Sequence, residues 1–157
     1  MDSVTFAQET CCQVWGEVEK LAQAHWQETE AAMYGGLHEV IDIAGFEALE
    51  ASGLLHITTI RDAGRLTGYA VFMLTAVPQM GGRTNASLVG LYLSPDVRKK
   101  SGGWLALGLL RESEKMLRKR GVDGIVYNSP HSRPCDALYL RLGAKPTETV
   151  FYKSLGE

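Results

Sequence analysis

The hydrophobic residues of this chain follow two spacings, one typical of strands and one typical of helices. Leu54 to Arg61 and Leu66 to Thr75 are rich in Ile, Thr, Val, Tyr and Phe, which suit a pleated sheet. Asp62 to Arg65 between them supplies turn residues. We therefore predict an antiparallel hairpin, followed by a polar, glycine-containing loop from Val77 to Asn85.

A helical spacing runs through the N-terminal part of the chain. From Thr5 to about Tyr34, apolar residues recur three and four positions apart, which predicts one long helix with one buried face. Gly35 and Gly36 are expected to end it. Leu37 to Ser52 predicts a loop and then a short helix that stops at Gly53. The apolar positions of the long helix are Ala7, Cys11, Val14, Val18, Leu21, His25 and Ala32.

The stretch from Leu88 to Arg120 combines both spacings. Leu88 to Leu93 is a short apolar run, and Ser94-Pro95-Asp96 ends it because proline cannot donate a hydrogen bond to a strand ladder. Leu105 to Leu117 has the pattern of an amphipathic helix. The residues between these two elements are expected to form a basic turn. They are Arg98, Lys99, Lys100, Ser101, Gly102 and Gly103.

A helix start that follows such a turn is suited to binding a phosphate group. The first backbone N–H groups of a helix have no partners within it and carry a partial positive charge. Glycine lets a ligand approach the backbone closely, and neighbouring cations attract a charged ligand. The alternative interpretation is a plain connection between strand and helix with a solvated basic turn.

The remaining pattern completes an α/β chain. Gly121 to Gly124 predicts a turn, and Ile125 to Tyr127 a short strand. A loop from Asn128 to Pro134 leads to a helix from Ala137 to Leu142, and Thr149 to Leu155 predicts a final strand. Because a helix connects them, the strands at Leu88 and Ile125 should lie parallel.

Composition narrows the class of protein. The 157 residues suit a single domain over 1–157, and a net charge of -2 argues against a nucleic-acid partner. No apolar stretch is long enough for a membrane helix and the N-terminus lacks a signal-peptide pattern, so we expect a cytoplasmic protein without a membrane partner. Three cysteines at Cys11, Cys12 and Cys135 predict neither a disulfide framework nor a metal site.

Two motifs resemble the GNAT family of N-acetyltransferases. Arg98-x-x-Ser101-x-Gly103 resembles the loop with which these enzymes hold the pyrophosphate of acetyl-coenzyme A (acetyl-CoA), although Ser101 replaces a glycine. Ala137-Leu138-Tyr139-Leu140-Arg141-Leu142-Gly143 resembles a second family signature, in which Ala144 replaces a phenylalanine. The resemblance covers about Leu54 to Leu155.

The resemblance implies a fold and a cofactor. The fold is the α/β GNAT fold, a central mixed, mostly antiparallel sheet flanked by helices, here with a long N-terminal helix, and the cofactor is acetyl-CoA. In this family the central strand holds the thioester with backbone N–H groups beside a bulge, for which Gly90 is the expected position. The implied cofactor-binding residues are Leu91, Tyr92, Leu93, Arg98, Lys99, Lys100, Ser101, Gly102, Gly103, Trp104 and Ser132.

The resemblance also implies catalytic residues. Tyr139 matches the family tyrosine that protonates the departing thiolate, a role that suits a phenol with a pKa near 10; the alternative is a helix tyrosine packed at a strand edge. His131 is the second predicted catalytic residue, because it lies beside the cofactor-side loop. Leu88 to Leu93 contains no carboxylate, so the general base stays open. The candidates are His131, His56, His25, Glu39 and a water relay.

The amine substrate is expected on the side of the N-terminal helix, as in the GNAT fold. His25 and Trp26 are predicted to contact it, with a purely structural core position as the alternative for His25. Tyr152 of the predicted final strand is expected to face the same site.

The implied function is transfer of an acetyl group from acetyl-CoA to a primary amine by direct attack. A protein lysine, a polyamine or a small antibiotic-like amine would each fit. One alternative is a catalytically silent GNAT module that binds CoA or a host protein, and a weaker one is a nucleic-acid-binding domain. The likeness extends to the small acetyltransferases of phage genomes, and the family suggests a possible homodimer.

Overall fold

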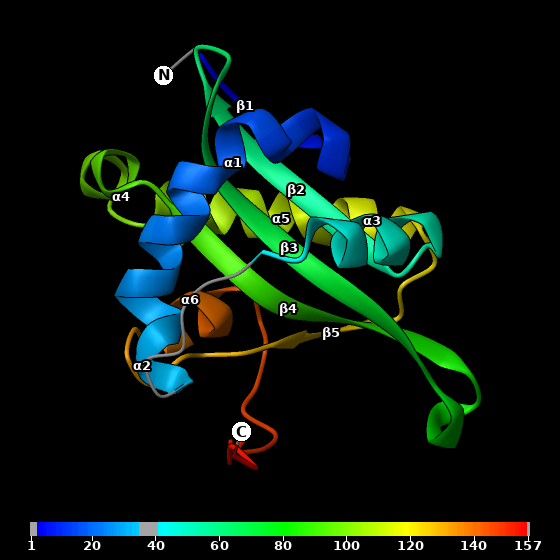
Figure 1. Cartoon of the computed structure of the whole chain (residues 1–157). Helices are drawn as coiled ribbons and strands as arrows, with labels where there is room; N and C mark the ends of the chain where they lie inside the picture. The colour runs from blue at the N-terminus through cyan, green and yellow to red at the C-terminus, as the bar shows by residue number, and fades with distance from the viewer. Residues whose placement is uncertain (1–2, 35–40, 157) are drawn as a thin grey trace.

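The computed structural model describes residues 3–34 and 41–156, which form a five-stranded sheet with helices on both faces (Figure 1). The strand order is β1-β2-β3-β4-β5, and the strands are β1 (Val4–Gln8), β2 (Leu55–Asp62), β3 (Arg65–Val77), β4 (Arg83–Leu93) and β5 (Gly124–Tyr127). The first four pair antiparallel, and β5 is parallel to β4. The predicted mixed, mostly antiparallel sheet is therefore confirmed, as are the hairpin and the parallel pair.

The N-terminal helix begins later than the sequence predicts. Val4–Gln8 is strand β1, and α1 (Cys11–His25) starts after Thr10, whose side chain and Gln13 form a capping box. The prediction of a helix from Thr5 was wrong because Val4 and Phe6, two residues apart, pack against the core from a strand. A π-helical turn (Trp26–Glu30) and α2 (Ala31–Met33) continue α1, so the long helix itself is confirmed.

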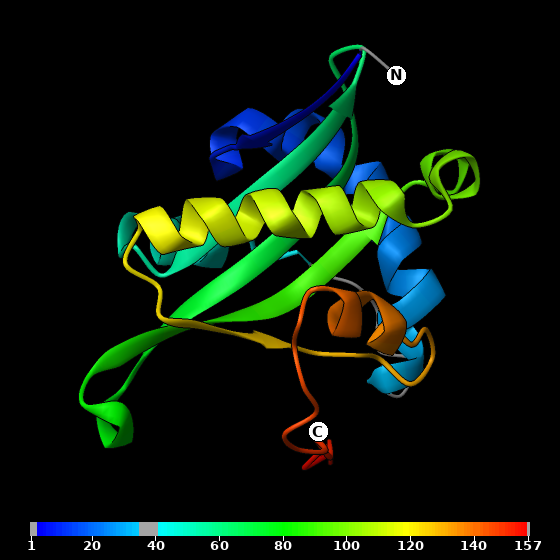
Figure 2. The ribbon, with the colours of Figure 1, turned by 180° about the vertical axis from the view of Figure 1, so that it is seen from behind.

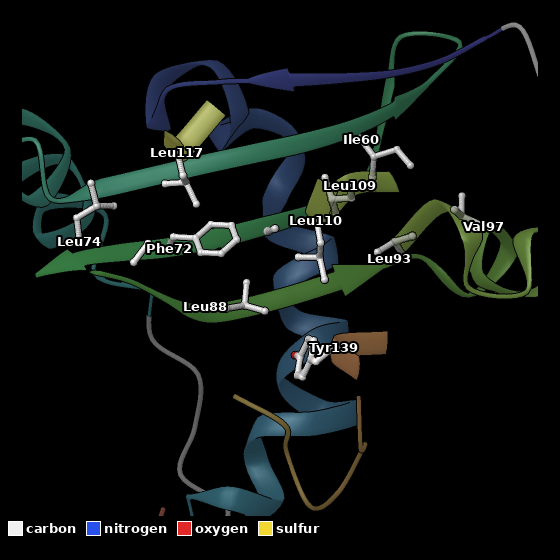
Figure 3. Close-up of a cluster of buried hydrophobic side chains, with 12 residues drawn as sticks. Ile60, Phe72, Leu74, Leu88, Leu93, Val97, Leu109, Leu110, Leu117 and Tyr139 are labelled. Atoms are coloured by element: carbon white, nitrogen blue, oxygen red, sulfur yellow. The ribbon is translucent and has the colours of Figure 1, made fainter. Parts of the chain in front are cut away.

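Helices cover both faces of the sheet. Helix α1 crosses one face together with α3 (Ile43–Ala51), and α5 (Trp104–Lys119) crosses the opposite face, where α6 (Asp136–Arg141) also lies (Figures 1 and 2). The larger core is buried between α5 and the sheet (Figure 3). Its members include Ile60, Phe72, Leu88, Leu93, Leu109, Leu110 and Leu117. A smaller cluster around Cys11, Leu55 and Ile57 packs under α1 and α3.

Three other segments differ from the prediction. Strand β4 begins at Arg83 rather than at Leu88, so the expected loop from Val77 to Asn85 is reduced to residues 78–82. The expected basic turn is mostly helical, because α4 (Pro95–Ser101) begins with Pro95 at a position where its fixed backbone angle favours a helix. The expected final strand from Thr149 to Leu155 is wrong. This segment leads away from the sheet, and Phe151 and Leu155 are 90% and 94% exposed (Figure 2). A strand-like sequence does not form a strand alone, and none of the five strands within residues 3–34 and 41–156 pairs with this segment.

Candidate active site

Strand β4 contains a β-bulge at Val89. Gly90 pairs with Val71 and Leu88 pairs with Phe72, so Val89 has no partner on β3. As a result, Leu88 before the bulge and Leu91 after it both pack in the α5-side core. The expected bulge position, Gly90, was therefore one residue away from the observed one.

Beyond the bulge, β4 and β5 separate. They pair only through Asn85 to Leu88 and Gly124 to Tyr127, and Figure 2 shows the two strands parting toward α6. At the point of separation the side-chain amide of Asn128 donates to the carbonyl of Leu88 at 3.0 Å. The predicted cofactor residues at 91–93 lie beyond this fork. Their backbone groups on the side of β5 are therefore not paired with that strand, which leaves them available to a ligand.

The connection from β4 to α5 leaves the start of α5 open. Gly102 and Gly103 have φ values of 55° and 92°, which favour glycine, and no other heavy atom lies within 4 Å of the position a Cβ would take at either residue. Lys99 and Lys100 are exposed beside it, and Trp104 is 68% exposed. The two glycines before α5 are thus not covered by other side chains, which suits the approach of a phosphate to the helix start.

Ser101 differs from its neighbours because it faces inward. Its residue is 7% exposed, and its hydroxyl has no hydrogen-bond partner within residues 3–34 and 41–156. Together with Lys100, Thr67 and Val97 it lines a cavity of about 210 Å³ between the sheet and the two helices α4 and α5. The serine in the glycine position of the motif therefore leaves the surface of the α4–α5 connection free of its side chain.

Glu28 connects three segments at the edge of β4. Its carboxylate accepts from the Tyr92 hydroxyl at 2.9 Å, from Arg98 Nη2 at 2.9 Å and from Arg133 Nη1 at 2.6 Å. Arg98 also lies 5.4 Å from the centre of the Tyr92 ring. Burial and Glu28 together raise the pKa of Tyr92 to about 12, so this phenol stays protonated. The predicted phosphate ligand Arg98 therefore has its side chain on the α1 side of the strand.

Sequence analysis did not select Glu28, although its spacing from His25 and Ala32 is that of the buried face. Glu28 lies within the π-helical turn from Trp26 to Glu30, and its partners come from β4, α4 and the loop after β5. No local signal in the sequence indicates these contacts.

His25 lies against the strand at Gly90. It is 7% exposed, its ring stacks on Tyr92 with centroids 5.2 Å apart, and its Nδ1 is 2.9 Å from the Tyr69 hydroxyl. Its Cε1 is 3.6 Å from the position a Cβ would take at Gly90. Burial lowers the pKa of His25 to about 4, and the charge of Glu28 only partly opposes this, so the imidazole is neutral near pH 7.

The other two predicted substrate residues meet through a residue that sequence analysis did not select. Trp26 stacks on Tyr34 with centroids 5.9 Å apart, and Tyr34 contacts Tyr152 edge to face at 5.1 Å. Burial, Glu30 and Tyr152 raise the pKa of Tyr34. These three rings form an aromatic row that continues from His25 toward the C-terminal segment.

Tyr139 packs behind the fork. Its hydroxyl donates to the carbonyl of Asn128 at 2.9 Å, and its ring stacks on Tyr127 with centroids 4.8 Å apart. Burial raises the pKa of Tyr139, so the phenol remains protonated. The residue thus lies where β5 leaves β4, with its proton held by a backbone carbonyl.

The remaining predicted residues do not gather at one point. His131 is exposed on the loop after β5, and Ser132 donates to the carbonyl of Thr29 at 2.9 Å. His56 is buried on β2, where Thr58 and Arg120 hold its ring nitrogens. Glu39 lies outside the described residues. Of the histidines predicted as general base, His25 is the one beside the bulge.

Residues 3–34 and 41–156 contain no group of three or more His, Cys, Asp or Glu side chains that could hold a metal ion. Over the same residues, none of the helices has the length and apolar character needed to cross a membrane.

Comparison with known proteins gives matches in structure alone. No family model matches the sequence, and no curated protein matches it. Solved structures match over nearly the whole chain. An aminoglycoside acetyltransferase from an uncultured soil metagenomic sample superimposes with a TM-score of 0.75 at 16% identity, covering 98% of this chain and 99% of the other.

Two further relatives act on different amines by their names. A ribosomal-protein-alanine N-acetyltransferase from Brucella melitensis has a TM-score of 0.71 at 18% identity, and glucosamine-6-phosphate N-acetyltransferase from Arabidopsis thaliana has 0.70 at 11%. Each match covers 98% of this chain and 99% of the other. At such identities the likeness concerns the fold. Together with the bulged strand, the fork and the α4–α5 connection, it shows that this chain has the fold of the GNAT N-acetyltransferases.

Proposed function

We propose that the protein is an acetyl-CoA-dependent N-acetyltransferase that transfers the acetyl group to a primary amine by direct attack. The observation that carries this proposal is the fork between β4 and β5, which leads directly to the open start of α5. A ligand with an extended arm and a charged phosphate end would use both features at once. A neighbour of similar fold, a predicted acetyltransferase from Clostridium acetobutylicum, was solved with acetyl-CoA.

The residues present fit this cofactor. The unpaired backbone of Leu91 to Leu93 would hold the pantetheine arm with N–H and C=O groups, as an added strand would be held. Gly102 and Gly103 expose the first N–H groups of α5 to the pyrophosphate, and Lys99 and Lys100 add positive charge nearby. Within this proposal the thioester supplies the acetyl group, and the chain binds and orients it.

Two requirements of the chemistry fall on side chains of the site. An alkyl amine is mostly protonated near pH 7, so a group beside the bulge must take a proton from it. A departing thiolate needs a proton donor, and we assign this role to Tyr139, which is protonated and lies behind the fork. To donate, Tyr139 must exchange its hydrogen bond to Asn128. His131 is exposed on the loop between β5 and α6, which also contains Asn128, and we keep it as a second candidate for proton transfer.

The amine substrate is assigned to the side of α1. The rings of Trp26, Tyr34 and Tyr152 lie together, and an ammonium group binds favourably to aromatic rings. The Glu30 carboxylate places negative charge near them and, after burial, helps to raise the pKa of Tyr34. We therefore propose a cationic amine. One neighbour of similar fold is an aminoglycoside acetyltransferase solved with sisomicin.

A catalytically silent module that binds CoA is the second candidate. Two contacts favour it: the Arg98 guanidinium is paired with Glu28, and the Tyr139 proton is held by the carbonyl of Asn128. Both residues would have to change partners during catalysis, whereas binding alone requires neither change.

Calorimetric titration with acetyl-CoA, CoA and 3′-dephospho-CoA, beside a thiol-release assay, tests both candidates. The amine panel contains sisomicin, spermidine, glucosamine 6-phosphate, a peptide with an N-terminal alanine and a lysine peptide. Binding with thiol release supports the transferase. Binding without release from any amine supports the silent module, and absence of binding contradicts both.

A further inference from the structure

We propose that Tyr69, His25 and Glu30 form a proton relay, which carries a proton from the amine substrate at the β4 bulge to the surface of the N-terminal helix. The inference rests on the proposed transferase function and assigns the proton acceptor that the sequence left open. Its starting point is that the bulge is lined by a phenol and an imidazole that contact each other.

The first member of the relay is Tyr69 on β3. Its Cε2 is 3.8 Å from the position a Cβ would take at Gly90, and its hydroxyl is 2.9 Å from His25 Nδ1. Gly90 has no side chain of its own, so its Cα leaves room on the α1 side of the strand between these two rings. The proposal places the amine nitrogen on the α1 side of the β4 bulge, against the Tyr69 oxygen.

The second member, His25, is oriented by its surroundings. Its Nε2 is 3.9 Å from the carboxylate of Glu30, which favours the tautomer with the proton on Nε2. His25 Nδ1 is then an acceptor, and Tyr69 donates to it. Tyr92 stacks on the ring and limits its rotation. The hydrogen-bond directions therefore run from Tyr69 through His25 toward Glu30.

Glu30 connects this buried pair to water. Its side chain is 27% exposed, and the 3.9 Å gap to His25 is longer than a hydrogen bond. One bridging water, or a small rotation of Glu30, completes the connection. The relay thus ends at a group that exchanges protons with solvent.

The surroundings of His25 favour the transfer of a proton through the imidazole over the formation of a stable imidazolium. The groups facing His25 are Tyr69 from β3, Tyr92 from β4, and Glu28 and Glu30 from its own helix, with Arg98 beyond Tyr92. Burial outweighs the charge of Glu28, lowers the pKa of His25 and keeps the imidazole neutral. A positively charged His25 would be unfavourable in this buried position. If the imidazole gains a proton at Nδ1 while it loses one at Nε2, no charge remains buried.

The protons balance across the reaction. As the C–N bond forms, the amine N–H breaks and its proton passes to the Tyr69 oxygen. The Tyr69 proton passes to His25 Nδ1, and the His25 Nε2 proton passes to Glu30. The C–S bond breaks, the thiolate takes a proton from Tyr139, and solvent carries the proton from Glu30 back to Tyr139. A substrate that binds as an ammonium first loses one proton to solvent through the same relay. The neutral amine and the thioester then become amide and thiol, with no further change in protons.

The relay is tested by Tyr69→Phe, His25→Gln and Glu30→Gln, with thiol release from acetyl-CoA measured on the best amine of the panel. We expect Tyr69→Phe to lower kcat by about 10²-fold, and Glu30→Gln by roughly 10-fold with part of the rate recovered as pH rises. CoA affinity should stay within about twofold of wild type. The matched controls are His56→Gln, a buried histidine on β2, and Glu19→Gln, an exposed carboxylate on α1.

Long-range ¹H–¹⁵N spectra give a readout that requires no turnover. The relay requires His25 protonated on Nε2 in the wild type, and the reverse tautomer would overturn it. Folded Tyr69→Phe and Glu30→Gln variants with wild-type kcat and an unchanged pH profile would overturn it as well. Failure of the proposed function looks different, because the wild type itself would then release no thiol.

Discussion

Arg98 donates to Glu28 at 2.9 Å across 70 positions of sequence, which places the arginine of the proposed phosphate motif on the α1 side of the sheet. The same carboxylate pairs with Arg133, so one negative charge is shared by two guanidinium groups. Glu28 thereby competes with any phosphate for both arginines.

Glu28→Gln should release this competition. We expect tighter CoA binding at low salt, by severalfold, because two arginines gain freedom to meet phosphates, and an unfolding free energy lower by about 1 kcal/mol from the lost partly exposed pairs. Titration calorimetry at low and high salt, with urea unfolding, measures both. Glu19→Gln removes a charge from α1 without touching an arginine and should change neither. Equal affinities for wild type and Glu28→Gln at low salt would contradict the competition.

Tyr139→Phe should lower turnover while leaving CoA affinity nearly intact. The phenol lies behind the fork with a raised pKa, so it can supply a proton but is not needed to bind the cofactor. Loss of its bond to Asn128 should also lower the unfolding free energy by about 1 kcal/mol. Steady-state kinetics and urea unfolding separate the two effects. A wild-type turnover would remove Tyr139 from the chemistry.

Gly103→Ala should weaken CoA binding and cost stability. Its φ of 92° is unfavourable for alanine by roughly 1–2 kcal/mol, and a methyl group there would stand over the first N–H groups of α5. Gly121 offers a matched control at the other end of α5, because it has a φ of 81° and equally open surroundings. Gly121→Ala should show the stability loss without the loss of affinity. If both variants bind CoA like wild type, the open helix start is not the phosphate site.

Acid should destabilise the fold through two buried histidines. Burial lowers the pKa of His25 and of His56 to about 4, with Arg120 adding to the effect at His56, from 6.5 for a free side chain. Between these values the unfolded chain binds more protons than the folded one. The contribution of each neutral histidine to the free energy of unfolding is therefore fully present above about pH 6.5. It decreases as the pH falls toward about 4, by on the order of 2–3 kcal/mol for each histidine.

Urea unfolding over this pH range, for wild type and His56→Gln, isolates one of the two contributions. The variant should lose about half of the histidine-dependent decrease. Identical pH profiles for the two proteins would show that His56 is not held neutral in the folded state.

Deleting residues 149–156 should leave stability within about 1 kcal/mol of wild type, because exposed side chains contribute little to the free energy of unfolding. Val150, Phe151 and Leu155 are all exposed, and Tyr152 contacts Tyr34 at the end of the aromatic row. Thermal unfolding measures the change in stability. The KM for the amine is expected to rise because Tyr152 is lost, and steady-state kinetics measure it. A large loss of stability would mean that this segment packs against the domain in solution.

The sequence predicts the elements whose contacts are local. The β2–β3 hairpin and the β4–α5–β5 unit follow from spacing and turn residues, and both are confirmed. Strand β1 was not predicted, because its partner strand β2 lies some fifty residues away in the sequence. Only Val4 and Phe6 indicate a strand locally, and the helical spacing of the following residues extends into this segment. Helix α4 is missed because its three cations suggest a turn.

The candidate site shows the same division. Motif spacing selects the α4–α5 connection and Tyr139, whereas the contacts of Glu28, Tyr69 and Tyr34 depend on elements brought together by the fold. The partners of Glu28 lie on β4, α4 and the loop after β5, so no local pattern around Glu28 indicates them.

The bulge at Val89 sets which side chains of β4 face the core. Upstream of it, Ala86 and Leu88 face the core; downstream, Leu91 and Leu93 do, and Gly90 is left for the site. Deletion of Val89 would reverse the two faces of the strand after this point. Leu91 and Leu93 would then face His25, and Tyr92 would face the core. The extra residue at Val89 therefore decides which face of the sheet each later side chain of β4 occupies.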